Sequence, residues 1–397
     1  MQGGWREPLR PAREWALVLA AFAMPFSIAI SQFAFAVALL LRLAEWAGGR
    51  APAKLGRGLT LITLAFVGWA LLDIAFSQVP GESLRHAKRF LLLPALWLYA
   101  EAGTRAVLRG RLLAALGAGA AGVAAYGIIA YLQGPRGLAG RAQLTQGYMT
   151  AGGLMMLAAL LLFVFLLLPG GPRRRRWLWP AFALTLVALV FTQTRSAWLG
   201  FAAGALLALV LVRPRFAPFF LGLLLTAGFF APAGFRERLL SSFDPRHTNN
   251  VQRVIMWRTG WDLLAEYPLT GVGDLDLQAI YRARHAGESV EVKGHLHSNP
   301  VMFAVLWGWP GLVLALGFLG ALAVALAKRW WTLARLAERA PPGAAGWTLA
   351  ALACWLGFML GGLFEWNFGD AEIALLTWAL CGLALAPLPT AGEGEVG

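Results

Sequence analysis

The sequence predicts an all-α polytopic membrane protein with about 12 transmembrane helices and one long periplasmic loop that contains short helices. Of its 397 residues, 59% are hydrophobic and 14% are charged, and the mean hydropathy is +0.63. A soluble domain carries nearer a quarter of charged residues. Apolar runs of about 17–25 residues recur along the chain, and lipid forces such runs into helices because backbone polar groups must be satisfied within the segment.

The apolar segments give the helix count. The first two are short and are separated only by Ser31 and Gln32, so one broken helix is an alternative reading. Twelve is preferred because it places both basic flanks of that hairpin on one side of the membrane. The segments lie near residues 15–29, 31–46, 59–77, 89–103, 112–133, 150–168, 177–192, 197–212, 217–232, 300–327, 347–364 and 371–388.

Basic residues predict the orientation of these helices. Alternate threading places 20 of the 34 Lys and Arg on one side and 14 on the other, of which 8 lie in residues 233–299. The short loops therefore divide 20 against 6, which assigns the first side to the cytoplasm. Both termini are expected there. Residues 1–14 lead into about 29 apolar residues, too many for a signal peptide, so the N-terminus is expected to be retained.

Four parts follow from this threading. Residues 1–232 are predicted to form transmembrane helices one to nine, residues 233–299 the periplasmic loop, residues 300–388 the last three helices, and residues 389–397 a cytoplasmic tail. A loop this long is usually functional. Within it, the stretch from Val254 to Leu264 has helical spacing.

Several classes of protein are disfavoured. The net charge of +14 comes from short loops without a nucleic-acid-reading motif, so no nucleic-acid partner is expected. Cys354 and Cys381 both lie in apolar runs, which supports neither a disulfide framework nor a cysteine metal site. The spacing of His295 and His297 is not the i,i+4 spacing of zinc-binding helices, so no metal is expected. Walker and dinucleotide-binding motifs are absent.

Cations on the predicted outer side contradict the orientation rule. They are either side chains that reach back to the interface or the lining of an anion site. Arginine suits phosphate because its planar fork donates two parallel hydrogen bonds. As a set, these residues favour an outer anion-binding cavity. They are Arg85, Lys88, Arg89, Arg136, Arg141, Arg195 and Arg253.

Arg195 and Arg253 are the strongest candidates. Arg195 lies in a five-residue polar turn between two apolar spans, so its guanidinium must lie at the membrane boundary, where a lipid-linked phosphate would also lie. Arg253 and Trp257 are four residues apart, on one helical face. Such a pair either anchors a helix at the interface or binds a lipid headgroup.

His297 lies where the long loop re-enters the membrane. Ser298 or Asn299 can cap a helix and Pro300 can begin it, which places His297 at the positive end of that helix and favours a neutral imidazole. An ordinary capping histidine is the alternative.

Two glycines follow at a fixed distance. Gly308 and Gly311 share a helical face and permit close approach of another helix, while Pro310 between them predicts a kink.

These motifs together resemble the bacterial O-antigen ligase family and its superfamily of O-antigen polymerases and protein O-oligosaccharyltransferases. The similar segments are His297-Ser298 followed by nine residues and Gly308-x-x-Gly311, Thr194 to Trp198, and Arg253 to Trp257 continuing to Pro268 and Gly271 to Gly273. The resemblance covers residues 180–385 by motif.

The resemblance implies a glycosyltransferase in the bacterial inner membrane, with its active site facing the periplasm. Such an enzyme moves O-antigen glycan from undecaprenyl pyrophosphate to a sugar of lipid A-core, inverts the anomeric centre and uses neither a metal nor a cofactor. Arg195 and Arg253 match the arginines expected to hold the pyrophosphate. His297 matches the candidate base for the acceptor hydroxyl.

Further residues are assigned to the substrate as hypotheses. Arg141, Arg136, Arg89 and Lys88 are candidates for binding phosphate. Asp370 either orients His297 or the acceptor, or caps the last helix.

Three other functions remain open. An O-antigen polymerase would use the same donor with a carrier-linked acceptor, and a protein O-oligosaccharyltransferase would use a Ser or Thr acceptor. A transporter of lipid-linked anions is the alternative outside the enzymes, and it would carry ionisable residues near mid-membrane. The clustering of polar residues at one face favours surface chemistry.

Overall fold

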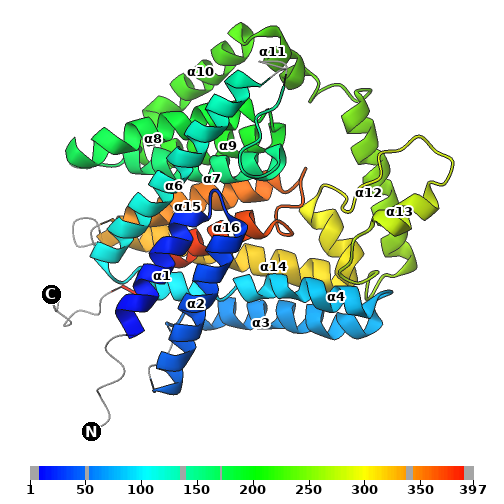
Figure 1. Cartoon of the computed structure of the whole chain (residues 1–397), viewed down its shortest axis with the longest axis horizontal. Coiled ribbons are helices and arrows are strands. Elements are labelled where there is room, and N and C mark those ends of the chain that lie inside the picture. Colours follow the sequence, from blue (N-terminus) through cyan, green and yellow to red (C-terminus); the bar gives the residue numbers. More distant parts are fainter. Residues whose placement is uncertain (1–8, 50–52, 135–139, 170–171, 337–342, 389–397) are drawn as a thin grey trace.

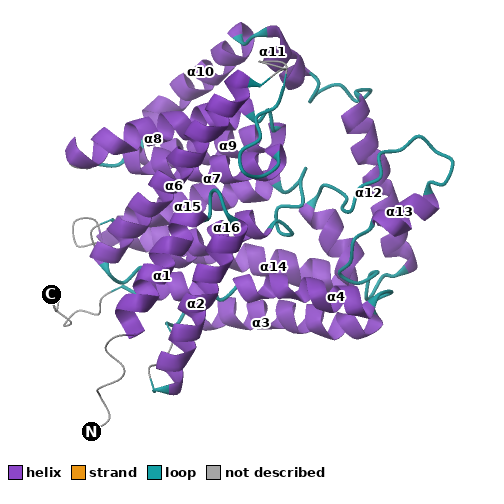
Figure 2. Ribbon diagram, viewed as in Figure 1, coloured by secondary structure: helices purple, strands orange, loops and turns teal. Residues whose placement is uncertain are grey.

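A computed structural model describes residues 9–49, 53–134, 140–169, 172–336 and 343–388. Every regular element in those residues is a helix (Figure 2), which confirms the predicted all-α class. The predicted tail, residues 389–397, lies outside the described residues.

The helices follow one another with short connections through the first half of the chain. They are α1 (Leu9–Ala23), α2 (Ile28–Ala47), α3 (Arg57–Leu72), the 3₁₀ turn η1 (Asp73–Phe76), α4 (Pro80–His86), η2 (Ala87–Leu92), α5 (Ala95–Ala102), α6 (Ala106–Gln133), α7 (Tyr148–Leu167), α8 (Pro172–Phe191) and α9 (Arg195–Val212).

The second half contains the long loop and the last helices. Its elements are η4 (Pro214–Phe216), α10 (Ala217–Phe230), α11 (Ala233–Leu240), α12 (Thr248–Glu266), α13 (Gln278–Arg284), α14 (Asn299–Leu336), α15 (Ala344–Gly361) and α16 (Ala371–Ala384). Figure 1 shows α12 and α13 beyond one end of α3 and α14. The helix predicted from Val254 to Leu264 lies within α12.

Each of the twelve apolar segments carries helix, but not every helix is long enough to cross a membrane alone. Among the described residues, seven helices are long and apolar enough, or eight if α10 and α11, bent by 117°, form one broken span. Two shorter apolar helices comprise residues Arg176–Phe191 and Ala371–Ala384. The prediction of several membrane helices is supported, whereas the count of twelve and the periplasmic assignment of the loop stay predictions.

Helix α7 occupies the centre of the bundle. It is apolar on every face, as a helix surrounded by other helices must be. Small residues allow its neighbours to approach closely: a Cβ atom on Gly200 of α9 would lie 2.7 Å from the carbonyl oxygen of Gly357 on α15. These close contacts join α7, α9 and α15 in the packed interior of the bundle.

Helix α14 is broken at the predicted glycine. Gly308 has φ 66° and ψ −170°, and Pro310 follows within the same turn. The break is filled by the loop after α12: Trp309 N–H donates to the Pro268 carbonyl at 2.9 Å, and Val272 N–H donates to the Val305 carbonyl at 2.9 Å. The kink is confirmed. The segment that approaches Gly308 closely is the backbone of the loop after α12, and not another helix as predicted. This loop forms hydrogen bonds with the backbone groups that lose their partners within the helix at the kink and at Pro310.

The first prediction concerns Gly308. A Cβ atom there would lie 2.2 Å from the Leu269 carbonyl oxygen, and the positive φ disfavours any other residue. Gly308→Ala should therefore lower the free energy of unfolding by at least about 1–3 kcal/mol. Thermal melting of the detergent-solubilised protein measures this. Gly320→Ala on the same helix is the control, since nothing lies within 4 Å of its Cβ position; equal melting temperatures for both variants would contradict the account.

Candidate functional site

A cavity of about 250 Å³ is lined by four of the eight predicted site residues. We call it the His297 cavity. Its walls come from the loop before α7, the start of α9, α11, α12, the segment before α14 and the loop between α15 and α16. The residues that line it are Arg141, Tyr148, Met149, Thr194, Arg195, Ser196, Arg238, Asn249, Gln252, Arg253, Met256, Glu291, Lys293, His295, His297 and Glu365.

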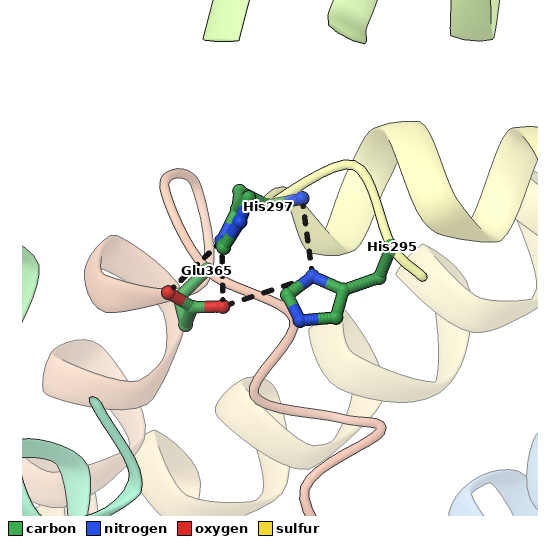
Figure 3. A group of neighbouring side chains, drawn as sticks. All are labelled: His295, His297 and Glu365. Atoms are coloured by element: carbon green, nitrogen blue, oxygen red, sulfur yellow. Dashed lines mark hydrogen bonds and ion pairs between the residues drawn. The ribbon is translucent and has the colours of Figure 1, made fainter. Parts of the chain in front are cut away.

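His297 forms a pair with Glu365. Its Nδ1 lies 3.0 Å from Oε1 and 3.2 Å from Oε2 of Glu365 (Figure 3), and the backbone N–H of Trp366 donates to Oε1 at 3.1 Å. A carboxylate at Nδ1 places the ring proton there, which leaves Nε2 as a proton acceptor. The side chain of His297 thus pairs with Glu365 instead of capping α14, and the arrangement is that of an oriented general base.

Two loops interlock to hold this pair. The N–H of Asn299 donates to the Gly362 carbonyl at 2.6 Å, and its side-chain oxygen accepts from the N–H of Phe368 at 3.2 Å. Asn299 therefore bridges the start of α14 to both ends of the loop that carries Glu365. The predicted helix start at residues 298–300 is confirmed, since α14 begins at Asn299. The side chain of Asn299 also fixes the position of the loop that carries Glu365.

The pKa of Glu365 agrees with a charged carboxylate beside His297. Burial raises it, but the hydrogen bond and charge of His297 outweigh the burial and lower the pKa below its usual value. The carboxylate therefore stays charged at neutral pH. For the neighbouring His295, burial lowers the pKa to about 4 although the charge of Glu365 opposes this shift.

Asp370 lies elsewhere. Its Oδ2 accepts from the hydroxyl of Thr150 at 2.6 Å, and burial together with Glu372 raises its pKa to about 8. It occupies the N-cap position of α16 without a side-chain capping bond. The acid beside His297 is Glu365, five residues earlier in the same outer turn.

Among the described arginines that line the cavity, Arg253 alone has a buried nitrogen without a hydrogen-bond partner. Arg253 lies on α12, and the unpaired nitrogen is its Nε. Burial lowers its pKa, which the charges of Glu365 and Glu291 partly restore. A buried donor of this kind costs free energy unless a ligand binds it.

Among the described residues, the hydrogen-bond partners of Arg195 are all neutral side chains. Its Nη1 donates to the hydroxyl of Ser241 at 3.0 Å and its Nη2 to the side-chain oxygen of Asn250 at 3.3 Å. A phosphate oxygen would form stronger, charge-assisted hydrogen bonds with the same donors.

Arg141 and Arg238 converge on one turn. Arg141 donates to the carbonyls of Thr192 at 3.0 Å and Gln193 at 3.3 Å, and its guanidinium lies 3.4 Å from the centre of the Tyr148 ring. Arg238 donates to the same Gln193 carbonyl at 3.0 Å. Burial, followed by the charges of Arg238 and Arg195, lowers the pKa of Arg141 to about 10. Arg238 was not singled out from the sequence, where it is one of eight cations in a long loop.

Backbone strain gathers at this cavity. In the described part of the chain, Gln193 at φ 51° and His297 at φ 48° are the non-glycine residues with positive φ. Left-handed backbone costs about 1–3 kcal/mol for such residues and clusters at functional sites. Both strained residues orient groups of the site. The carbonyl of Gln193 accepts hydrogen bonds from Arg141 and Arg238, and the imidazole of His297 faces Glu365.

Among the predicted substrate-binding cations, Arg89 and Lys88 do not line the cavity. Arg89 is ion-paired with Asp274 at 3.1 Å and lies over the ring of Trp366 at 5.5 Å, so it supports the loop of Glu365 from outside. Lys88 is exposed and does not line the cavity. Arg136 lies outside the described residues.

His295, His297 and Glu365 also meet the geometric minimum for a metal site. Their ligand atoms all lie within 4.8 Å of one another. The surroundings oppose a cation, however: four arginines and Lys293 line the cavity, against Glu291 and Glu365. This charge balance favours an anionic ligand.

The fold and the site thus define a membrane protein whose cavity combines a histidine–carboxylate pair with a cluster of arginines. Residues 180–316 match the O-antigen ligase family model, and this match supports a member of the O-antigen ligase and polymerase superfamily. The matched region includes Arg195, Arg253 and His297, whereas Arg141 and Glu365 lie outside it. Among curated proteins, none matches the chain significantly.

The second prediction is that the cavity binds inorganic pyrophosphate. Arg253→Gln should weaken this binding by about ten- to a hundredfold, because it removes charged hydrogen bonds from a buried anion. Isothermal titration calorimetry of the purified protein measures the affinity. Arg258→Gln, on the exposed face of the same helix, is the control. The same affinity in both variants would remove Arg253 from the anion site.

The third prediction concerns acid stability. Because the pKa of His295 falls from 6.5 to about 4 on folding, the unfolded chain binds more protons between these values. This group therefore contributes stability that is complete above pH 6.5 and is lost as the pH falls toward 4. In His295→Gln, the melting temperature should depend less on pH across this interval. An unchanged dependence would show that His295 is solvated in the folded state.

Proposed function

We propose that this protein is an O-antigen ligase. It transfers O-antigen glycan from undecaprenyl pyrophosphate to a sugar of lipid A-core at the periplasmic face of the bacterial inner membrane, with inversion and without a metal. The observation that carries the proposal is that one cavity contains both His297, oriented by Glu365, and Arg253, whose buried Nε has no hydrogen-bond partner among the described residues.

The arginine side of the cavity suits the leaving group. As the bond between the anomeric carbon and the phosphate oxygen breaks, negative charge grows on the pyrophosphate. Arg253, Arg195 and Arg238 line the space in which that charge would lie. Preorganised donors in a partly desolvated site stabilise such charge more than water does.

The histidine side suits the acceptor. In the proposed step, the acceptor hydroxyl attacks the anomeric carbon while its proton passes to Nε2 of His297. Glu365 holds Nδ1–H and stabilises the imidazolium that forms. Because attack and departure occur on opposite faces of the sugar, a single displacement inverts the anomeric centre.

The size of the cavity limits what it encloses. A volume of about 250 Å³ is below that of pockets that enclose a drug-sized ligand. It suits the reacting sugar and the phosphates, while the polyprenyl chain and the remaining glycan extend outside. The open rim agrees with an acceptor that is itself a large glycolipid.

An O-antigen polymerase would use the same leaving group and base. The residues of the cavity therefore support the donor chemistry of both enzymes, and the acceptor distinguishes them.

The fourth prediction is made for transfer itself. Purified protein is supplied with a polyprenyl-pyrophosphate glycan and lipid A-core in the presence of a chelator, and the glycosylated core is separated by gel electrophoresis. The native protein should form product. His297→Ala should lower the turnover number by about 10²–10⁴-fold, the usual contribution of a general base. Glu365→Gln should cause a smaller loss, because the imidazole remains but its charged partner is removed.

The matched control is His247→Asn, which alters a half-buried histidine that does not line the cavity and keeps a capping acceptor for α12. Product that grows on the carrier while lipid A-core is ignored would replace the ligase with a polymerase. Full turnover by His297→Ala would exclude the histidine as base.

A further inference from the structure

A second cavity lies among buried charges near the start of α1. It has a volume of about 440 Å³, larger than the His297 cavity. Helices α1, α2, α5 and α6 surround it, and we call it the Arg13 cavity. The charged residues that line it are Arg10, Arg13, Arg42, Arg105, Glu14 and Glu101.

The two cavities open at opposite ends of the bundle. Helix α6 begins at Ala106, next to Arg105, and its other end lies beside the His297 cavity, where Tyr131 donates to the Gly140 carbonyl at 3.4 Å. Its 28 residues span about 40 Å at 1.5 Å per residue. This is the thickness of a bilayer with its headgroups. The Arg13 cavity therefore faces the membrane surface opposite the His297 cavity, which the charge distribution predicts to be cytoplasmic.

Aromatic side chains mark the level of that surface. Trp15 on α1 and Trp46 on α2 are 60% and 59% exposed, and the Arg111 guanidinium lies 5.2 Å from the centre of the Trp15 ring. Exposed tryptophans beside arginines are typical of the interface between acyl chains and headgroups. The Arg13 cavity thus lies at the depth of lipid phosphates.

The four arginines of the cavity outnumber the three carboxylates that pair with them, which are Glu14, Glu45 and Glu101. Arg13 pairs with Glu101 at 3.0 Å and with Glu45 at 3.6 Å, and Arg42 pairs with Glu101 at 2.7 Å. Arg10 and Arg105 both pair with Glu14.

The network also leaves a buried donor unused. Nε of Arg13 has no hydrogen-bond partner among the described residues, although the whole residue is only 5% exposed. An anion in the cavity would supply the missing negative charge and an acceptor.

We propose that the Arg13 cavity binds the phosphate group of an anionic phospholipid at the face opposite the His297 cavity. Basic pockets between membrane helices recognise such headgroups, and arginine forks match phosphate oxygens. The phosphate would lie among the four arginines while the acyl chains extend past Trp15 into the bilayer. Free inorganic phosphate has the same recognition chemistry and is the other source to distinguish.

The experiment measures binding to the full-length protein in detergent by isothermal titration calorimetry. The probes are short-chain phosphatidylglycerol, short-chain phosphatidylcholine and inorganic phosphate. The main variant is Arg10→Gln with Arg105→Gln. These side chains are 48% and 44% exposed, so their replacement leaves the buried pairs of Arg13 intact. The charge-matched control is Lys54→Gln with Arg57→Gln, at exposed positions outside the cavity.

We expect phosphatidylglycerol to bind in preference to phosphatidylcholine, and its affinity to fall about thirtyfold when both arginines are replaced. The control pair should keep the native affinity, and so should Arg253→Gln, which separates this site from the His297 cavity. Inorganic phosphate that binds as tightly, with the same loss in the main variant, would assign the site to the free ion. Equal affinity for phosphatidylcholine, or equal loss in the two double variants, would overturn the proposal.

Discussion

Four guanidinium groups and a lysine share the His297 cavity with two carboxylates, and this excess of positive charge is the constraint around which the surrounding loops are arranged. Like charges at close range are stable only when neutral dipoles solvate them. The turn at Gln193 supplies such dipoles to Arg141 and Arg238, and the segment after α11 supplies them to Arg195. The solvation is incomplete at Arg253. An anionic ligand bound in the cavity would complete it.

The broken helix α14 connects the loops that carry the charged residues of the cavity to the rest of the fold. The loop of residues 268–273 fills the break at Gly308, and Asn299 joins the start of the same helix to the loop that carries Glu365. Both contacts pair backbone N–H and C=O groups, and such a group would be costly if it were buried without a partner. One helix thereby holds the base, its carboxylate partner and the loop after α12 in a fixed relation.

Much of this arrangement could be predicted from the sequence. Apolar runs indicated the helices, because lipid leaves few other conformations. The distribution of charge predicted that four site residues lie on one face of the membrane, and the structure brings all four to one cavity. They are Arg141, Arg195, Arg253 and His297.

The rest depends on tertiary contacts that carry no local signal. Glu365 and Asp370 lie in the same turn, and only the fold decides which of them faces His297. Arg89 was predicted to bind phosphate, but in the structure it forms an ion pair with Asp274, which is distant in the sequence. The length of each helix could not be predicted either. The apolar segments that contain α5 and α16 have the composition of transmembrane helices, although these two helices are short.

The central claim is that the leaving pyrophosphate lies on the arginine side of the His297 cavity and the acceptor on the histidine side. Its most direct test is a cryo-electron microscopy structure with a non-hydrolysable polyprenyl-pyrophosphate sugar. We expect phosphate oxygens about 2.7–3.2 Å from the guanidinium groups of Arg253 and Arg195, with the anomeric carbon facing Nε2 of His297. Phosphate density beside His297 and Glu365, or outside the cavity, would contradict it.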